Sequence, residues 1–317
     1  MKVWTGIESI SAPVGPLSVA VGTFDGVHVG HQTLIAAAVR DARSHERASA
    51  VFTFDRRPMD VIAPERAQGY LTTPAQRERA IAALGVDHLV VARFDTRLRE
   101  TAPDGFVRDT LAGRLGARTV MVGEGFRFGR DQSGGVRVLR ERGRDAGIDV
   151  VVLRPVMVGG QKASSSRARE LVLAGNVAEA ARVLGRPFAL VGTVIEGDRI
   201  GRTLGYPTAN LRVDFPQVIP AYGIYAVRVA HSGGTWPGAA SIGIRPTIGG
   251  RERRIEAYLM DFDGDLYGQV LEVSFIERLR DELRFDSLEA LVTQMGRDVA
   301  EARALVAASD PPAQPPG

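Results

Sequence analysis

The amino-acid sequence predicts two domains: an α/β domain built on a parallel sheet, then a mostly antiparallel β-barrel with a C-terminal helix. The first observation is the length, because 317 residues exceed what one average core accommodates. The second is that apolar, β-prone runs alternate with helix-like segments in the first half of the chain. The third is that the second half consists of short apolar runs between turn residues, which is typical of a barrel. We place the boundary near Arg186.

The α/β domain is predicted from strand-like runs and the helix-like segments between them. The first run, residues 17–22, is apolar and leads into a glycine-rich turn. The segment 31–45 then carries apolar side chains at helical spacing, namely Leu34, Ile35, Ala38 and Val39. Further strands are expected at 49–54, 87–94, 117–123 and 148–156, and further helices at 73–85, 103–116 and 136–147. This alternation favours a parallel sheet covered by helices.

The barrel domain is predicted from five short strand-like runs. They occupy residues 188–197, 222–230, 238–244, 254–262 and 269–277. A closing helix is expected over 287–309, and the proline-rich C-terminal end is not expected to pack. We therefore predict an α/β domain over 1–185, a barrel over 186–306 and a disordered tail over 307–317.

The composition excludes several classes of protein. The chain has no cysteine, which rules out disulfides, thiolate metal sites and cysteine nucleophiles. The net charge is +3 without a run of Lys or Arg, so we expect small anionic ligands and no nucleic-acid partner. The first ten residues lack the apolar segment of a signal peptide, and an 18-residue apolar run is absent. We expect a cytoplasmic protein with no membrane partner, and the oligomeric state stays open.

The stretch GTFDGVHVGH, residues 22–31, holds three glycines and two histidines where a strand leads into a helix. Such a turn suits a phosphate, because glycines let the backbone approach the anion and the helix N-terminus presents free N–H groups. His28 and His31 lie one turn apart at this helix start, so both can donate hydrogen bonds to a transferring phosphate. The alternative is a tight turn with a histidine cap and a surface histidine; the coincidence of these features favours the phosphate site.

The stretch GDRIGRTLGYPTANL, residues 197–211, is a second candidate phosphate site, since the chain contains no Walker A sequence. Gly201 and Gly205 can supply a flexible cap with exposed N–H groups, and Pro207 stiffens the next turn. Thr208 and Asn210 are two residues apart, so in a strand their oxygens share a face that suits one Mg²⁺. A glycine-rich hairpin ending in an Asx turn explains the same residues equally well.

Both stretches resemble parts of one known family. Residues 22–31 resemble the H-x-G-H signature of nucleotidyltransferases, and the order of segments along the chain is similar to the bifunctional riboflavin kinase/FAD synthetase family. The matching segments are GVDHLVVARFD, VMVGEGFRFG, ASSSRARELVLAGNVAEAARVLGRP, GYPTAN, YGIYAV, SIGIRPTIGG, RIEAYLMDFDGDLYG and LRDELRFDSLEAL. The resemblance extends from about residue 1 to about residue 305. It implies a Rossmann-like nucleotidyltransferase domain that converts FMN to FAD and a barrel that converts riboflavin to FMN.

The resemblance assigns roles in adenylyl transfer to residues of the first domain. It implies that His28 and His31 bind ATP phosphates and that a flavin pocket contains Phe54, Phe126 and Phe128. The implied nucleotide-binding set is Gly22, Thr23, Phe24, Asp25, Gly30, Ser165, Ser166 and Arg169. ATP is then the co-substrate, FMN and FAD are products, and Mg²⁺ is expected in both steps because it neutralises charge on the transferring phosphates.

The resemblance also assigns roles in the barrel. Glu256 is implied as the base for the attack of the ribityl hydroxyl on the γ-phosphate, a role that suits a carboxylate because it accepts the hydroxyl proton. Without that context, a lone glutamate in a strand is an exposed charge. The implied nucleotide-binding residues are Gly201, Gly205 and Pro207, the magnesium ligands are Thr208 and Asn210, and the flavin-binding residues are Arg280 and Phe285.

This chain departs from the family pattern at several positions. The family has Phe-x-Pro-His-Pro where this chain has FDRRP, and Arg56 and Arg57 are thereby available to bind the FMN phosphate. The other departures are Gly125 and Gly135 in place of Asp or Asn, Ser166 in place of Thr and Ala168 in place of Ile. Because the polar group at Gly125 is lost, a riboflavin kinase without adenylyltransferase activity is a second interpretation. A non-catalytic regulator that binds a flavin or nucleotide is a third.

Overall fold

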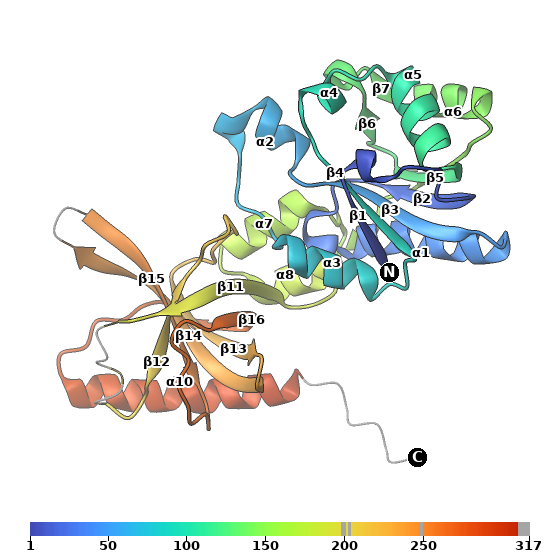
Figure 1. Ribbon diagram of the computed structural model, residues 1–317. Helices are drawn as coiled ribbons and strands as arrows, with labels where there is room; N and C mark the ends of the chain where they lie inside the picture. The colour runs from blue at the N-terminus through green and yellow to red at the C-terminus, as the bar shows by residue number, and fades with distance from the viewer. Residues whose placement is uncertain (198–200, 202–203, 248–249, 310–317) are drawn as a thin grey trace, which may run out of the picture. The chain divides into compact units, whose positions relative to one another are not determined.

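The computed structural model describes residues 1–197, 201, 204–247 and 250–309 (Figure 1). The chain forms two compact units, and each is described by itself. The first unit comprises Met1–Gln68 and Pro74–Ser165, and the second comprises Gly69–Thr73 and the chain from Ser166 onward. The predicted domain limits of 1–185 and 186–306 stay predictions, and residues 310–317 of the predicted tail lie outside the described residues.

The first unit contains a six-stranded parallel sheet, which confirms the predicted fold class. Its strand order is β1-β4-β3-β2-β5-β8, and every neighbouring pair is parallel. The strands are β1 (Lys2–Thr5), β2 (Leu17–Val21), β3 (Ala48–Phe54), β4 (His88–Ala92), β5 (Ala117–Gly123) and β8 (Asp149–Leu153). The sequence analysis did not predict β1, because this edge strand is short and mostly exposed, without the apolar run that marks the buried strands.

Helices cover this sheet, and α1 (Val29–Ser44) confirms the predicted periodicity. Its Leu34, Ile35, Ala38 and Val39 are all buried in a cluster with sheet residues that include Val51 and Met121. The other helices are α2 (Pro58–Ile62), α3 (Pro74–Ala82), α4 (Thr96–Arg99), α5 (Pro103–Gly105), the π-helix η4 (Phe106–Arg114) and α6 (Val136–Asp145). Short elements complete the unit: η1 (Ile7–Ser9), η2 (Asp25–Val27), η3 (Pro64–Arg66), β6 (Arg127–Phe128), η5 (Arg130–Gln132), β7 (Gly134–Gly135), β9 (Met157–Val158) and β10 (Gln161–Lys162).

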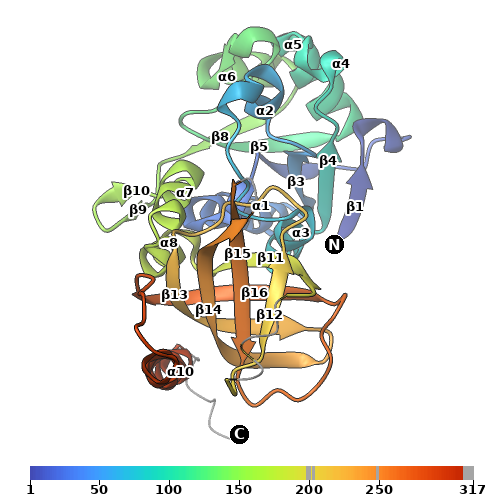
Figure 2. The ribbon, with the colours of Figure 1, turned by 90° about the vertical axis from the view of Figure 1, so that its left-hand side faces the viewer.

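The second unit is a closed antiparallel barrel, also as predicted (Figure 2). Its order is β11-β12-β15-β14-β13-β16, and buried and partly exposed residues alternate along β11. The strands are β11 (Phe188–Ile195), β12 (Thr208–Arg212), β13 (Gly223–His231), β14 (Gly234–Thr247), β15 (Gly250–Leu259) and β16 (Val270–Arg280). This alternation turns one set of side chains into the barrel core and the other set away from it.

Helices precede and follow the barrel. The C-terminal helix α10 (Leu288–Ala308) begins at an N-cap, Ser287, whose hydroxyl accepts a hydrogen bond from the Ala290 N–H. Its Ala302 and Val306 pack on residues of the barrel wall. The helices α7 (Ser165–Leu173) and α8 (Val177–Leu184) precede the barrel, and α8 contacts β11 and β16. Among the described residues, none of the helices is long and apolar enough to cross a bilayer.

Two candidate active sites

The turn between β2 and α1 has an unusual backbone. Phe24 and Val27 adopt φ angles of 52° and 41°, in the left-handed region that costs free energy for residues other than glycine. Phe24 is fully buried and its ring packs edge-on against His31. Its ring also lies 3.1 Å from where a side chain on Gly22 would begin, so Gly22 leaves room for it. The surrounding residues therefore hold this turn in one specific shape.

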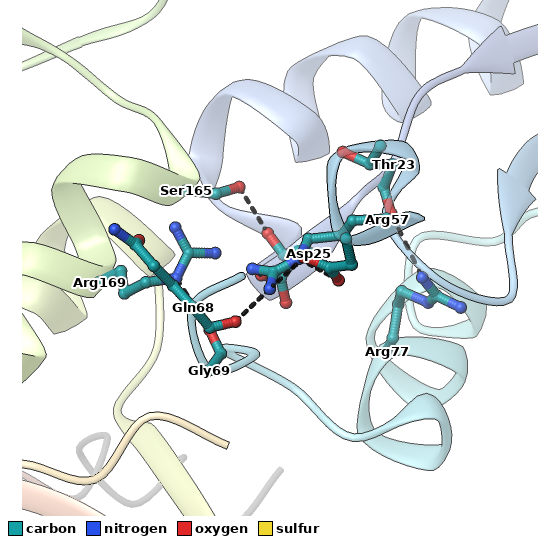
Figure 3. A network of polar contacts seen from close by, with 9 residues as sticks. Thr23, Asp25, Arg57, Gln68, Gly69, Arg77, Ser165 and Arg169 are labelled. Carbon is teal, nitrogen blue, oxygen red and sulfur yellow. Dashed lines mark hydrogen bonds and ion pairs between the residues drawn. The ribbon is translucent and has the colours of Figure 1, made fainter. Parts of the chain in front are cut away.

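Polar contacts from neighbouring segments fix the carbonyl groups of this turn (Figure 3). The carbonyl oxygen of Thr23 accepts hydrogen bonds from Thr53 Oγ1 at 3.0 Å and from Arg77 Nη1 at 3.3 Å. Ser165 Oγ donates to the carbonyl oxygen of Asp25 at 2.8 Å. Because these acceptors are satisfied inside the protein, the turn keeps its shape without a ligand.

The two histidines lie at the start of α1. His28 Nδ1 accepts hydrogen bonds from the backbone N–H groups of Gly30 and His31, at 3.1 and 3.3 Å, and thereby caps the helix. This assigns the proton of a neutral His28 to Nε2. The two imidazole rings stack with centroids 3.6 Å apart. His31 Nδ1 is buried and has no hydrogen-bond partner among the described residues.

Both imidazoles are neutral at pH 7. Burial, together with the smaller effect of the nearby charge of Lys162, lowers the pKa of His28 to about 4. Burial also lowers the pKa of His31 well below its usual range, with His28 as the second cause. At this pH the pair therefore offers ring N–H donors and carries no positive charge.

These pKa shifts predict that the protein loses stability as the pH falls from about 6.5 to about 4. In that window the unfolded chain binds a proton at His28 that the folded chain does not, so the free energy of unfolding decreases. His28→Asn keeps an acceptor for the helix cap and removes the titrating group. Urea unfolding at several pH values should therefore give a shallower pH dependence for this variant, and equal slopes would contradict the assignment.

Arg57 and Arg56, the departures from the family pattern, have different surroundings. Arg57 Nη1 lies 3.3 Å from Oδ2 of Asp25, whose side chain is only 2% exposed. Arg57 also donates to both carboxylate oxygens of Asp60, at 2.9 and 3.0 Å, and to the carbonyl oxygen of Gln68 (Figure 3). Arg56 is exposed, with Asp55 3.6 Å away. The Arg57 guanidinium is thus engaged within the protein, which argues against the role at the FMN phosphate that the sequence suggested for it.

Replacing Arg57 is predicted to destabilise the first unit. Arg57→Met leaves the Asp25 carboxylate buried without its ion partner, which costs about 3–5 kcal/mol. The matched change Arg56→Met removes the same charge from the adjacent exposed residue and should cost about 0.5 kcal/mol or less. Urea unfolding of both variants measures the difference, and equal losses would show that the Asp25 contact contributes little.

The three phenylalanines predicted for the flavin pocket belong to one aromatic cluster. Phe126 stacks on Phe128 with ring centroids 5.4 Å apart. Phe54 joins them through Phe52 and Phe106, whose successive ring contacts span 5.5–5.7 Å. Phe128 is buried, whereas Phe54 and Phe126 are partly exposed. The cluster therefore offers ring surface at Phe54 and Phe126 and core packing at Phe128.

The two glycines that replace polar family residues are not required by close packing. A Cβ on Gly125 meets no atom within 4 Å, and Gly125 is exposed. A Cβ on Gly135 lies 2.8 Å from the end of the flexible Arg127 side chain. The backbone would therefore accept Asn at Gly125.

The remaining predicted phosphate-loop residues, Ser166 and Arg169, lie in the second unit on α7. Ser166 is exposed. Arg169 is 5% exposed, and its Nε donates to the carbonyl oxygen of Gly69 at 2.9 Å (Figure 3). This bond fixes the short segment Gly69–Thr73 to α7, a structural role that the sequence motif did not predict.

The second candidate site lies on the wall of the barrel, where β12 and β15 are antiparallel neighbours. Asn210 pairs directly with Glu256, and Thr208 lies two residues away on the same face. Thr208 Oγ1 donates to Glu256 Oε1 at 3.0 Å. The intervening Ala209 and Ala257 are buried on the opposite face. The structure therefore brings together the three residues that the sequence singled out.

Arg254 completes this cluster, and the sequence analysis missed it. Its Nε donates to Asn210 Oδ1 at 2.8 Å, and its Nη2 lies 3.2 Å from Glu256 Oε1. The signal was present in the stretch RIE, because residues two apart in a strand share a face.

The glycines before β12 form a tight turn. The Gly201 carbonyl accepts hydrogen bonds from the N–H groups of Leu204 and Tyr206, at 3.1 and 2.8 Å. A side chain at Gly201 would collide with the Tyr206 carbonyl, and Gly205 has a φ of 84°. Pro207 is exposed at the entry to β12. Residues 198–200 and 202–203 of the predicted phosphate loop lie outside the described residues.

The two residues predicted near the flavin ring, Arg280 and Phe285, also lie together. The Arg280 guanidinium is 5.9 Å from the centroid of the Phe285 ring. It also forms a close ion pair with Asp298 of α10, which is 5% exposed and accepts a further bond from Gln294. Arg280 thus ties β16 to α10, a packing role beside any contact with a flavin.

Comparisons with known proteins agree with the two units. The FAD synthetase family model matches residues 12–167, and the riboflavin kinase family model matches residues 184–306. Curated relatives described as bifunctional riboflavin kinase/FMN adenylyltransferase include the protein of Escherichia coli K12, which is 36% identical over 96% of this chain and 97% of its own length. The Pseudomonas fluorescens protein is 38% identical over 98% of this chain and 99% of its own.

A solved structure shares the whole fold. It is titled a macrolide-efflux protein from Streptococcus pneumoniae, is 32% identical, covers 96% of this chain and 99% of its own, and superimposes with a TM-score of 0.86. The two family models and the full-length relatives agree in the order of the two units. The chain therefore belongs to the bifunctional riboflavin kinase/FMN adenylyltransferase family.

Proposed function

We propose that this protein phosphorylates riboflavin to FMN on the barrel and adenylylates FMN to FAD at the turn before α1, with ATP as co-substrate in both steps. The observation that supports the proposal most is the cluster of Thr208, Asn210 and Glu256 on adjacent strands. It combines a base and two neutral oxygen ligands in the part of the chain that matches riboflavin kinases.

In the kinase step, Glu256 accepts the proton of the ribityl hydroxyl as its oxygen attacks the γ-phosphorus of ATP. The bond between that phosphorus and the ADP oxygen breaks, so that FMN and ADP form. Thr208 Oγ1 and Asn210 Oδ1 would hold Mg²⁺, and these hard oxygens on one strand face fit that ion. The described residues contain no cluster of three or more His, Asp or Glu suited to a metal, so phosphate and water oxygens would supply the remaining ligands. When bound, Mg²⁺ neutralises charge on the transferring phosphate.

In the adenylyl step, an oxygen of the FMN phosphate attacks the α-phosphorus of ATP, and pyrophosphate leaves. The neutral rings of His28 and His31 donate N–H hydrogen bonds to the phosphate oxygens at the N-terminus of α1, where the helix dipole also favours negative charge. The partly exposed rings of Phe54 and Phe126 are proposed to contact the flavin. A cytoplasmic location and the lack of a nucleic-acid partner stay predictions.

One incubation tests the proposed function. The protein is mixed with riboflavin, ATP and Mg²⁺, and the products are separated by chromatography. FAD is the expected product. FMN alone would contradict the adenylyltransferase assignment and leave a kinase, and neither product would contradict catalysis and leave a binding protein.

A further inference from the structure

We infer that Arg254 is a positioning residue of the barrel site that orients the base Glu256 and the magnesium ligand Asn210 at the same time; this inference rests on the proposed kinase function. Arg254 lies two residues before Glu256 on β15 and on the same face of that strand. The resemblance to the kinase family assigns roles to Thr208, Asn210 and Glu256 and leaves Arg254 without one.

The geometry links the two functional residues through one guanidinium group. Nε of Arg254 donates to Asn210 Oδ1 at 2.8 Å, and Nη2 lies 3.2 Å from Glu256 Oε1. Asn210 and Glu256 occupy directly opposed positions on β12 and β15, so Arg254 spans the two strands. The planar fork of arginine keeps its donors at fixed angles, which suits a bridge of this kind better than lysine does.

The contacts also determine which oxygen of Glu256 takes part in the reaction. Thr208 Oγ1 and Arg254 Nη2 both approach Oε1, at 3.0 and 3.2 Å. With Oε1 held by these two donors, Oε2 is the oxygen that accepts the ribityl hydroxyl proton. Misplacing the base by even a fraction of an ångström lowers the rate, because proton transfer requires hydrogen-bond distance in the transition state.

The burial of Asn210 makes its orientation important. The residue is 9% exposed, and a side chain on Gly197 would collide with its amide nitrogen. Its Oδ1 has two lone pairs, of which one accepts from Arg254 and the other is available to Mg²⁺. Arg254 thus fixes which way the amide oxygen points, and the space left by Gly197 accommodates the amide nitrogen.

The test separates positioning from direct binding of the nucleotide. Arg254→Met keeps an unbranched side chain about as far as Nε and removes the guanidinium donors. Arg253→Met removes the same charge from the exposed neighbouring residue. Arg254→Met should lower kcat for FMN formation about tenfold or more, with KM for ATP changed less than about threefold. Arg254→Lys should have a higher kcat than Arg254→Met, and added guanidinium ion should partly restore the kcat of Arg254→Ala. Arg253→Met should have the kcat and KM of the unsubstituted protein.

Three outcomes would overturn this role: an unchanged kcat in Arg254→Met, a raised KM for ATP at constant kcat, or an equal loss in Arg253→Met. Because conversion of FMN to FAD takes place on the first unit, urea unfolding of the same preparations is used to report whether the barrel of Arg254→Met is folded. The unsubstituted protein is assayed alongside. If it makes no FMN, the proposed kinase function fails; if it makes FMN and Arg254→Met matches it, only the role of Arg254 fails.

Discussion

Glu256→Gln is expected to lower the rate of FMN formation by about 10²–10⁴-fold, the contribution typical of a general base. The amide cannot accept the proton of the ribityl hydroxyl, so the attacking oxygen stays a poor nucleophile. The substitution preserves shape, and the carbonyl oxygen of glutamine can still accept the 3.0 Å hydrogen bond from Thr208. The loss should therefore appear in kcat, measured by chromatography of FMN under saturating ATP.

The same Glu256→Gln preparation provides its own control. Supplied with FMN and ATP, it should form FAD at the rate of the unsubstituted protein, because His28 and His31 are unchanged. Urea unfolding should shift little, since Glu256 is partly exposed at 26% of its side chain. FMN formation at an undiminished rate would remove Glu256 from the mechanism.

His28→Asn is expected to lower the rate of FAD formation from FMN by about 10²–10³-fold, the usual cost of deleting one donor to a developing phosphate charge. Asn is a good N-cap residue, so its side-chain oxygen replaces Nδ1 as the acceptor for the Gly30 and His31 N–H groups. His28→Asn thus removes the ring N–H that is proposed to face the phosphate and keeps an acceptor for the helix cap. FMN formation from riboflavin should be unchanged.

His28→Ala is the comparison variant for the cap. It should lose the same activity and also about 1 kcal/mol of stability, because the first turn of α1 loses its side-chain acceptor. Adenylylation is followed by chromatography of FAD and stability by urea unfolding. If His28→Asn retained full activity while His28→Ala lost it, His28 would serve the helix cap alone.

Much of the fold was predictable because it follows from local periodicity. The helical spacing of Leu34, Ile35 and Ala38 in the sequence indicates the face of α1 that the structure buries. The short apolar runs likewise indicated the barrel strands except β12, which was not among them. The edge strand β1 was not predictable in this way, since its pairing with β4 is a tertiary contact made by a short and mostly exposed segment.

In the candidate sites, too, some residues were predictable from local sequence patterns and others depended on tertiary contacts. The motifs located His28 and Glu256, because each belongs to a short pattern with a chemical rationale. They did not indicate which partners the arginines would bind. Arg57 pairs with Asp25 and Arg280 with Asp298, and each of these partners is set by folding and not by spacing in the sequence. The pairing of Arg254 with Glu256 differs from these, because the two-residue period of a strand places both residues on one face and makes the contact predictable from the sequence.

We propose that two separate sites each use ATP, with FMN as the product of one and the substrate of the other. Mixing the two inactivated variants tests it most directly. Glu256→Gln alone should make no FAD from riboflavin, and His28→Asn alone should stop at FMN. Together, with riboflavin, ATP and Mg²⁺, they should form FAD after a lag in which FMN accumulates. A mixture that accumulates FMN but never forms FAD would contradict the account.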